Sequence, residues 1–198
     1  MSILRYITHP NVEIDPHTPV TEWHLSDVGR RRAHALLEQS WIDSVDLVIS
    51  SAETKAIETA ELIAARRNLV VDVRRSTGEI DRSATGFVEP ERHELLADQF
   101  FADPERSTSG WERAVDAQRR IVDAVSDVLG TPIDAVGDVA VVGHGAVGTL
   151  LLCHLDGRAI SRSHDQSGQG HYWSYDRSDH RLLHAWRPID EVPPRREP

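Results

Sequence analysis

Short apolar runs alternate with amphipathic stretches along most of the chain. Four runs rich in isoleucine, leucine and valine are too short for helices and predict strands at residues 3–7, 46–49, 69–73 and 139–142. Apolar residues at three-to-four spacing predict helices over residues 26–39, 54–66, 111–129 and 146–155. Strands that alternate with helices are joined by right-handed crossovers into a parallel sheet. We therefore predict an α/β fold with three layers, α/β/α, around a mostly parallel central sheet.

Two regions depart from this alternation. Residues 76–110 are interrupted by glycine and proline, which predicts a long irregular insertion of the kind that forms lids or binding loops. Near the end of the chain, residues 171–175 and 182–186 predict a closing hairpin. We expect a single domain over residues 1–192 and a disordered tail at 193–198.

Composition narrows the class of protein. The 198 residues suit one globular domain, with 39% hydrophobic and 27% charged residues. The net charge of −10 argues against nucleic acid or an anionic membrane as a partner, and no apolar run is long enough to span a membrane. One cysteine, Cys153, excludes an internal disulfide and suits a reducing compartment. Because the N-terminus also lacks the pattern of a signal peptide, we expect a cytoplasmic protein.

Chemically useful residues stand where three predicted strands end. His9 follows the first strand, which Pro10 terminates because proline cannot donate to a sheet ladder. Ser50-Ser51 ends the second strand, and His144 follows the strand at 139–142. The carboxyl ends of parallel strands share one edge, where ligands bind, and helix N-termini at that edge favour anions. The sequence therefore predicts an oxyanion or phosphate site.

The sequence gives weaker support for two other kinds of site. Residues 143–148 match the dinucleotide motif G-x-G-x-x-G, but they come late in the chain and no acidic residue follows at the required place. His164, Asp165 and His171 could bind a metal, although they lack the short paired spacing of a helical zinc site. We favour neither.

Five short motifs occur in order over residues 3–155. They are Thr8-His9-Pro10, Leu25 to Arg30, Ser50 to Ala60, Gly78 to Asp81 and Val142 to Gly145. Together they resemble Arg-His-Gly, Leu-Thr-x-x-Gly, Ser-Ser-x-x-x-Arg-Ala-x-x-Thr-Ala, Leu-x-Glu and Val-Ser-His-Gly of the histidine phosphatase superfamily. The resemblance implies a phosphoglycerate mutase-like fold, in a divergent subgroup that has Thr-His-Pro in place of Arg-His-Gly.

The resemblance also implies a two-step phosphoryl transfer. His9 would be the nucleophile that forms a phosphohistidine, and His144 would stabilise charge on the phosphoryl oxygens. Lys55 would replace the arginine of the family as a second cation. Glu79 would be the general acid and then the base, with Asp81 as the competing carboxylate. The resemblance implies no metal and no cofactor.

The departures from the family motifs affect the positions that would bind phosphate. Thr8 replaces an arginine, and a threonine carries no charge to pair with a phosphate oxygen. We expect Thr8, Asn11 and Arg82 to be the substrate-binding residues. Arg82 is the preferred replacement cation, with Arg5 as the alternative, and Asn11 could donate its amide to phosphate or simply hold the turn.

Two functions follow from this pattern. We expect a phosphatase that acts on a small phosphorylated substrate or a phosphoprotein. The alternative is a phosphate-binding or regulatory protein of the same fold with little turnover. A mutase is less favoured, because the chain is short and the insertion is small. The sequence predicts no oligomeric state.

Overall fold

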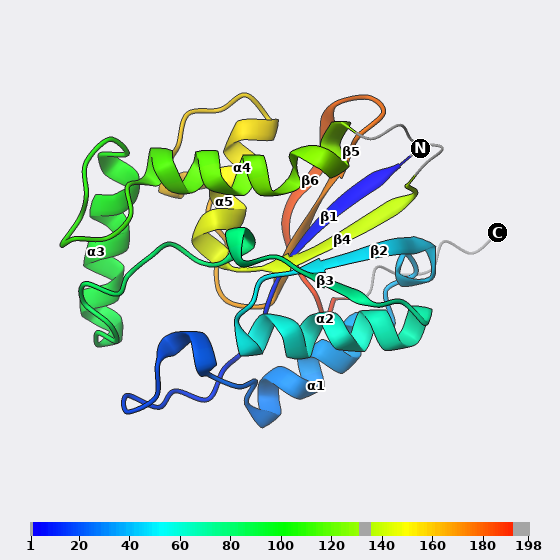
Figure 1. Cartoon of the computed structure of the whole chain (residues 1–198), viewed down its shortest axis with the longest axis horizontal. Coiled ribbons are helices and arrows are strands. Elements are labelled where there is room, and N and C mark those ends of the chain that lie inside the picture. The colour runs from blue at the N-terminus through cyan, green and yellow to red at the C-terminus, as the bar shows by residue number, and fades with distance from the viewer. Residues whose placement is uncertain (1, 131–135, 192–198) are drawn as a thin grey trace.

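A six-stranded sheet forms the centre of the computed structural model, which describes residues 2–130 and 136–191 (Figure 1). The strand order is β3-β2-β4-β1-β5-β6. The strands are β1 (Ile3–Thr8), β2 (Val45–Ser50), β3 (Val71–Val73), β4 (Asp138–Gly143), β5 (His171–Asp176) and β6 (Arg181–Pro188). Neighbours among the first four strands are parallel, whereas β5 is antiparallel to β1 and to β6. The sheet is therefore mostly parallel, as predicted.

Helices cover both faces of the sheet. They are α1 (Asp27–Leu36), α2 (Thr54–Arg67), α3 (Pro90–Ala102), α4 (Ala114–Gly130) and α5 (Gly145–Leu155). Figure 1 shows α1 and α2 on one face, α4 and α5 on the other, and α3 beyond the end of the sheet. Short 3-10 turns lie at Val20–Glu22, Ile42–Ser44, Arg75–Thr77 and Arg162–His164. The predicted three-layer α/β/α architecture is confirmed.

The alternation of side chains along the strands divides the core into two parts. In β4, Val139 and Val141 pack toward α4 and α5, whereas Ala140 and Val142 pack toward α1 and α2. Successive residues of a strand point to opposite faces, so a run that is apolar throughout is buried on both sides. This explains why the clearest apolar run in the sequence forms a central strand.

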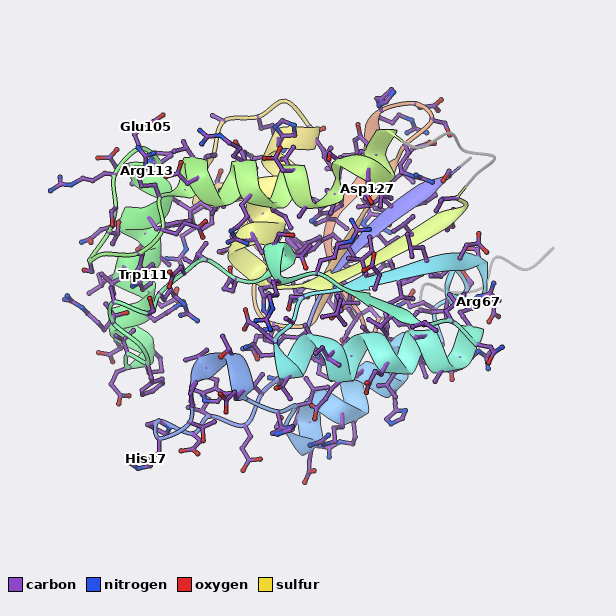
Figure 2. All side chains as sticks on the ribbon, viewed as in Figure 1. His17, Arg67, Glu105, Trp111, Arg113 and Asp127 are labelled. Carbon is purple, nitrogen blue, oxygen red and sulfur yellow. The ribbon has the colours of Figure 1, made fainter. Side chains whose placement is uncertain are left out.

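The insertion contains a helix that the sequence analysis did not predict. Residues 76–110 were expected to be irregular, but α3 begins at Pro90, which occupies the first turn, where its missing N–H costs nothing. Leu96, Phe100 and Phe101 are its buried face. They pack in the same cluster as Trp111, which lies beside α3 in Figure 2.

Other boundaries differ by a few residues. The helix expected over 111–129 begins at Ala114, because Trp111 belongs to the turn after Thr108, whose carbonyl accepts from its N–H. The helix expected over 26–39 begins at Asp27 and ends at Leu36. Its N-cap is Ser26, whose side chain accepts from the N–H of Gly29. The tail at 193–198 lies outside the described residues. Over the described ranges, no helix is long and apolar enough to cross a membrane.

Tyr6 links the fold to the end of β4. Its hydroxyl accepts from the N–H of His144 (3.0 Å) and donates to the carbonyl of the same residue (3.1 Å). Its ring stacks on Trp173 with centroids 5.4 Å apart, and Tyr6 is fully buried. One side chain thus holds the backbone of His144 in place.

We expect Tyr6→Phe to lower the free energy of unfolding by about 1–3 kcal/mol, because the buried N–H of His144 loses its acceptor. Urea denaturation measures the change. The control is Tyr175→Phe, since the Tyr175 hydroxyl makes no hydrogen bond between described residues. An equal effect of the two substitutions would contradict this role of Tyr6.

Candidate active site

Two histidines meet at the carboxyl end of the sheet. In the parallel pairing of β1 with β4, Thr8 lies opposite Gly143, so the next residue of each strand is a histidine. The N–H of His9 still donates to the carbonyl of Gly143 (3.1 Å). The His9 and His144 rings have centroids 5.2 Å apart and planes at 64°. The predicted juxtaposition of the two imidazoles is therefore present.

His9 is held as a neutral imidazole with one defined tautomer. Its Nδ1 lies 2.9 Å from the carbonyl oxygen of Pro10. Because a carbonyl can only accept, the ring proton is on Nδ1, and Nε2 carries the lone pair. Burial, with the nearby His144 and Lys55, lowers the pKa of His9 from 6.5 to about 3. A neutral imidazole with a free lone pair is the form that can act as a nucleophile.

His144 lies at the N-cap of α5 and faces two side chains from the end of β2. Its Nε2 is 2.7 Å from Oγ of Ser51 and 3.2 Å from Oε1 of Glu53. Its Nδ1 is buried and makes no hydrogen bond within the described residues. Burial and the positive charge of Lys55 hold the pKa of His144 well below its ordinary value.

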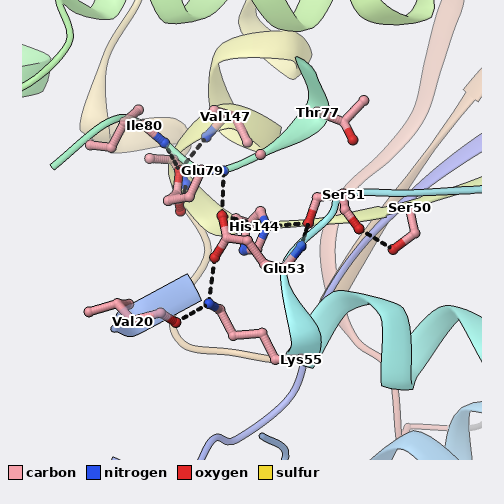
Figure 3. Close-up of polar contacts among 12 residues, drawn as sticks. Val20, Ser50, Ser51, Glu53, Lys55, Thr77, Glu79, Ile80, His144 and Val147 are labelled. Carbon is pink, nitrogen blue, oxygen red and sulfur yellow. Dashed lines mark hydrogen bonds and ion pairs between the residues drawn. The ribbon is translucent and has the colours of Figure 1, made fainter. Parts of the chain in front are cut away.

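A buried ion pair lies beside His144 (Figure 3). Nζ of Lys55 is 2.5 Å from Oε2 of Glu53 and donates to the carbonyl of Val20 at 2.7 Å. Both charged residues are almost wholly buried, with 3% of Lys55 and 8% of Glu53 exposed. Two buried charges of opposite sign stabilise each other only in close contact, so this pair fixes both groups at the site.

Glu79 places a second carboxylate against the N-terminus of α5. Its Oε2 accepts from the N–H of Ala146 and its Oε1 from that of Val147, both at 3.3 Å (Figure 3). Arg120 of α4 anchors this segment by donating to the carbonyls of Gly78 and Glu79. Burial raises the pKa of Glu79, although Arg82 and the backbone N–H groups oppose the shift. A raised pKa suits a group that must hold a proton and then release it.

His9, Glu53, Lys55, Glu79 and His144 line one cavity of about 420 Å³. Its apolar lining includes Trp23 and Phe87, whose rings lie 5.8 Å apart, together with Trp111. Arg82 also lines the cavity, with its guanidinium carbon 5.7 Å from the centre of the Trp111 ring. No carboxylate forms a direct ion pair with Arg82 within residues 2–130 and 136–191, but its charge acts on the nearby Glu79.

Comparison with known proteins identifies the family. The family model described as histidine phosphatase superfamily (branch 1) matches residues 8–176. This chain belongs to the histidine phosphatase superfamily. The match includes both histidines, Lys55 and Glu79, and no curated protein sequence matches the chain.

Many solved structures have a fold similar to that of this chain. A mycobacterial glucosyl-3-phosphoglycerate phosphatase in complex with inorganic phosphate is 19% identical, with a TM-score of 0.79 over 97% of this chain and 100% of that one. A putative alpha-ribazole-5'-P phosphatase from Escherichia coli is 18% identical, with a TM-score of 0.72 over 97% and 98%. A phosphoserine phosphatase from Entamoeba histolytica, in complex with 3-phosphoglyceric acid, is 17% identical, with a TM-score of 0.74 over 94% and 98%. At these identities the likeness shows the fold.

Two residues predicted to bind substrate do not line the cavity of this histidine phosphatase. Thr8 is 1% exposed, and its hydroxyl donates to Oε1 of Gln166 (2.7 Å) and accepts from the N–H of His171 (2.9 Å). The side-chain oxygen of Asn11 accepts from Arg32 at 2.9 Å. Thr8 thus joins β1 to the loop before β5, and Asn11 holds the turn after the first strand, which was its other predicted role.

The competing candidates for two roles also lie away from the histidines. The carboxylate of Asp81 is exposed and accepts from Ser83, which lowers its pKa, and Asp81 does not line the cavity. Arg5 forms an ion pair with Asp138 at 2.7 Å and lies over the ring of Trp41. Their placement leaves Glu79 and Arg82 as the residues that reach the site.

Glu53 and Gln166 are residues of the cavity that the sequence analysis missed. Glu53 was an unspecified position inside the serine motif, and Gln166 was part of a polar loop. Gln166 packs so close to Gly145 that a Cβ there would lie 2.6 Å from its amide nitrogen. No local pattern in the sequence marks either residue as part of the site.

Two of the three residues considered for a metal, Asp165 and His171, have other partners. Asp165 accepts from the hydroxyl of Thr149 at 2.7 Å, and Nε2 of His171 is 3.2 Å from the hydroxyl of Ser167. Among the described residues, no group of three histidine, cysteine or acidic side chains could hold an ion.

The lowered pKa of His9 makes folding depend on pH. As the pH falls, the unfolded chain binds the proton first, so the stability due to neutral His9 is complete above about pH 6.5 and is lost toward pH 3. Between pH 7 and pH 5 we expect wild type to lose roughly 2 kcal/mol more unfolding free energy than His9→Asn. Urea denaturation at both pH values measures this. Exposed His34→Asn is the control, and an equal loss in His9→Asn would contradict the assignment.

Proposed function

We propose that this histidine phosphatase superfamily member is an active phosphatase that hydrolyses a phosphomonoester, either a small molecule or a phosphoprotein side chain. The observation that carries the proposal is the neutral His9 imidazole, with its proton fixed on Nδ1 by Pro10 and its lone pair in a cavity shared with His144. The family and the fold agree with this chemistry.

In the first step, the lone pair of His9 Nε2 attacks phosphorus. The N–P bond forms as the bond to the ester oxygen breaks, and that oxygen takes a proton from the carboxyl group of Glu79. The Nδ1 proton stays on the ring and remains bonded to the carbonyl of Pro10. Lys55 and Arg82 supply the positive charge that faces the transferring phosphoryl group, which is the electrostatic contribution to catalysis.

In the second step, water replaces the histidine. Glu79, now a carboxylate, accepts a proton from water as the water oxygen bonds to phosphorus. The N–P bond breaks, orthophosphate leaves, and both His9 and Glu79 return to their starting states. These steps use protein groups alone, and a single carboxyl group serves as acid and then as base.

The proposed substrate fits the cavity by size and polarity. A volume of about 420 Å³ accommodates a small organic group, and aromatic side chains form part of the lining. Structures of similar fold carry the names of phosphatases of small phosphorylated molecules.

The buried Cys153 agrees with a reducing compartment such as the cytoplasm.

The second candidate is a phosphate-binding or regulatory protein with little turnover. Two features of the site favour this candidate. Glu53 neutralises the charge of Lys55. Thr8, which replaces an arginine of the family motif, is uncharged, and its hydroxyl is hydrogen-bonded to Gln166. This protein would bind phosphate in the same cavity without forming a covalent intermediate.

Phosphate trapping on histidine separates the two candidates. After brief exposure to a ³²P-labelled phosphomonoester and denaturing quench at alkaline pH, where phosphohistidine survives, we expect stable label on wild type. His9→Ala removes the nucleophile, so we expect no label and a fall in turnover of at least about 10³-fold.

Exposed His34→Ala, on α1, is the matched control and should be labelled like wild type. If wild type binds orthophosphate but acquires no label across a panel of aryl, sugar and amino-acid phosphates, the phosphatase proposal fails. The binding-protein alternative then holds.

A further inference from the structure

The Glu53 carboxylate collects donors from three parts of the chain. Its Oε2 accepts from Nζ of Lys55 on α2 (2.5 Å), and its Oε1 lies 3.2 Å from Nε2 of His144 and accepts from the N–H of Glu79 at 2.9 Å. Figure 3 shows the carboxylate between these groups. An ammonium, an imidazole and a backbone N–H converge on one buried anion.

This donor set is the kind that recognises a phosphoryl group. Phosphate oxygens accept from lysine, from histidine and from backbone N–H groups, and Lys55 and His144 are the residues that the proposed function assigns to the phosphoryl oxygens. A phosphate dianion cannot share these donors with the carboxylate, because like charges in one buried site repel strongly. Either the ligand binds elsewhere or Glu53 has to leave.

The structure provides a place for the displaced side chain. Glu53 lines a second cavity of about 760 Å³ in addition to the one that contains the histidines. Arg75, which is exposed, and Arg82 line that second cavity too. The second cavity is also lined by Glu22, Glu79 and Asp81, so a Glu53 side chain that rotated into it would need Arg75 or Arg82 as its partner.

We propose that Glu53 is a resident anion that holds the phosphoryl-binding position when no ligand is bound, and that substrate or phosphate must displace it. Glu53 thereby lowers the affinity for phosphate and keeps Lys55 and His144 in position between turnovers. The location of the phosphoryl position rests on the proposed function, whereas the competition between Glu53 and a phosphate dianion does not require turnover.

The test compares orthophosphate binding to wild type and to Glu53→Gln by isothermal titration calorimetry at pH 7.5. Glutamine is similar in shape but carries no charge, so the competitor is weakened and Lys55 is released. We expect Glu53→Gln to bind orthophosphate at least tenfold more tightly, which corresponds to about 1.4 kcal/mol. Unchanged or weaker binding would overturn the proposal, because a carboxylate that merely positions Lys55 would assist binding.

Two controls make the result specific. Glu58→Gln removes a charge from the same helix, where Glu58 pairs with His24 and Arg30, and should leave phosphate affinity unchanged. Adding Lys55→Met to Glu53→Gln should remove the gain, because the released cation is then absent. A gain that persists in the double variant would contradict the competition.

The unique lysine gives a second readout. In protein labelled with ¹⁵N-lysine, Lys55 is the source of the only side-chain ammonium signal. We expect orthophosphate to shift this signal in wild type and at lower concentration in Glu53→Gln; no shift in either protein would overturn the proposal.

If Glu53→Gln does not fold, Glu53→Asp is used instead. Its side chain is shorter by one methylene and cannot reach all three donors, so it should bind phosphate more tightly than wild type, and equal binding would overturn the proposal. A failure of the labelling experiment on His9 would refute the phosphatase function while leaving this comparison of affinities decisive for Glu53.

Discussion

The parallel pairing of β1 with β4 is the constraint on which the site depends. Because Thr8 pairs with Gly143, two histidines separated by 135 positions along the chain lie one residue beyond the sheet with rings 5.2 Å apart. A slip of one residue would turn every side chain of a strand to the opposite face. Tyr6 connects the same two strands by binding the backbone of His144. The sheet thus fixes the geometry, and burial then keeps both rings neutral.

Charge in the site is balanced rather than strongly positive. Lys55 is matched by Glu53, Glu79 lies against the N-terminus of α5, and Arg82 faces the cavity without an ion-pair partner among the described residues. In a protein with a net charge of −10, this balance gives little general attraction for anions. If phosphate binds here, as we propose, it has to compete with Glu53 for Lys55 and His144.

Much of the fold could be predicted from sequence because the spacing of apolar residues and the residues that end strands indicate the same elements. Apolar runs such as Val139 to Val142 gave the central strands, and Pro10 correctly ended the first. The helix α3 does not follow from the sequence pattern because Pro90 is compatible both with a loop and with the first turn of a helix, where it lies in the structure. In the site, strand ends predicted the two histidines, but Glu53 and Gln166 could not be predicted. Their roles depend on which way a side chain points into the cavity, and no local pattern specifies that direction.

The central claim is that His9, His144 and Lys55 surround one tetrahedral anion after Glu53 moves aside. A crystal structure of the protein with orthovanadate tests this most directly. We expect vanadium bonded to Nε2 of His9, an equatorial oxygen in contact with His144, and the Glu53 carboxylate turned away from Lys55. Vanadate bound elsewhere, or bound while Glu53 keeps its contacts with Lys55 and His144, would contradict it.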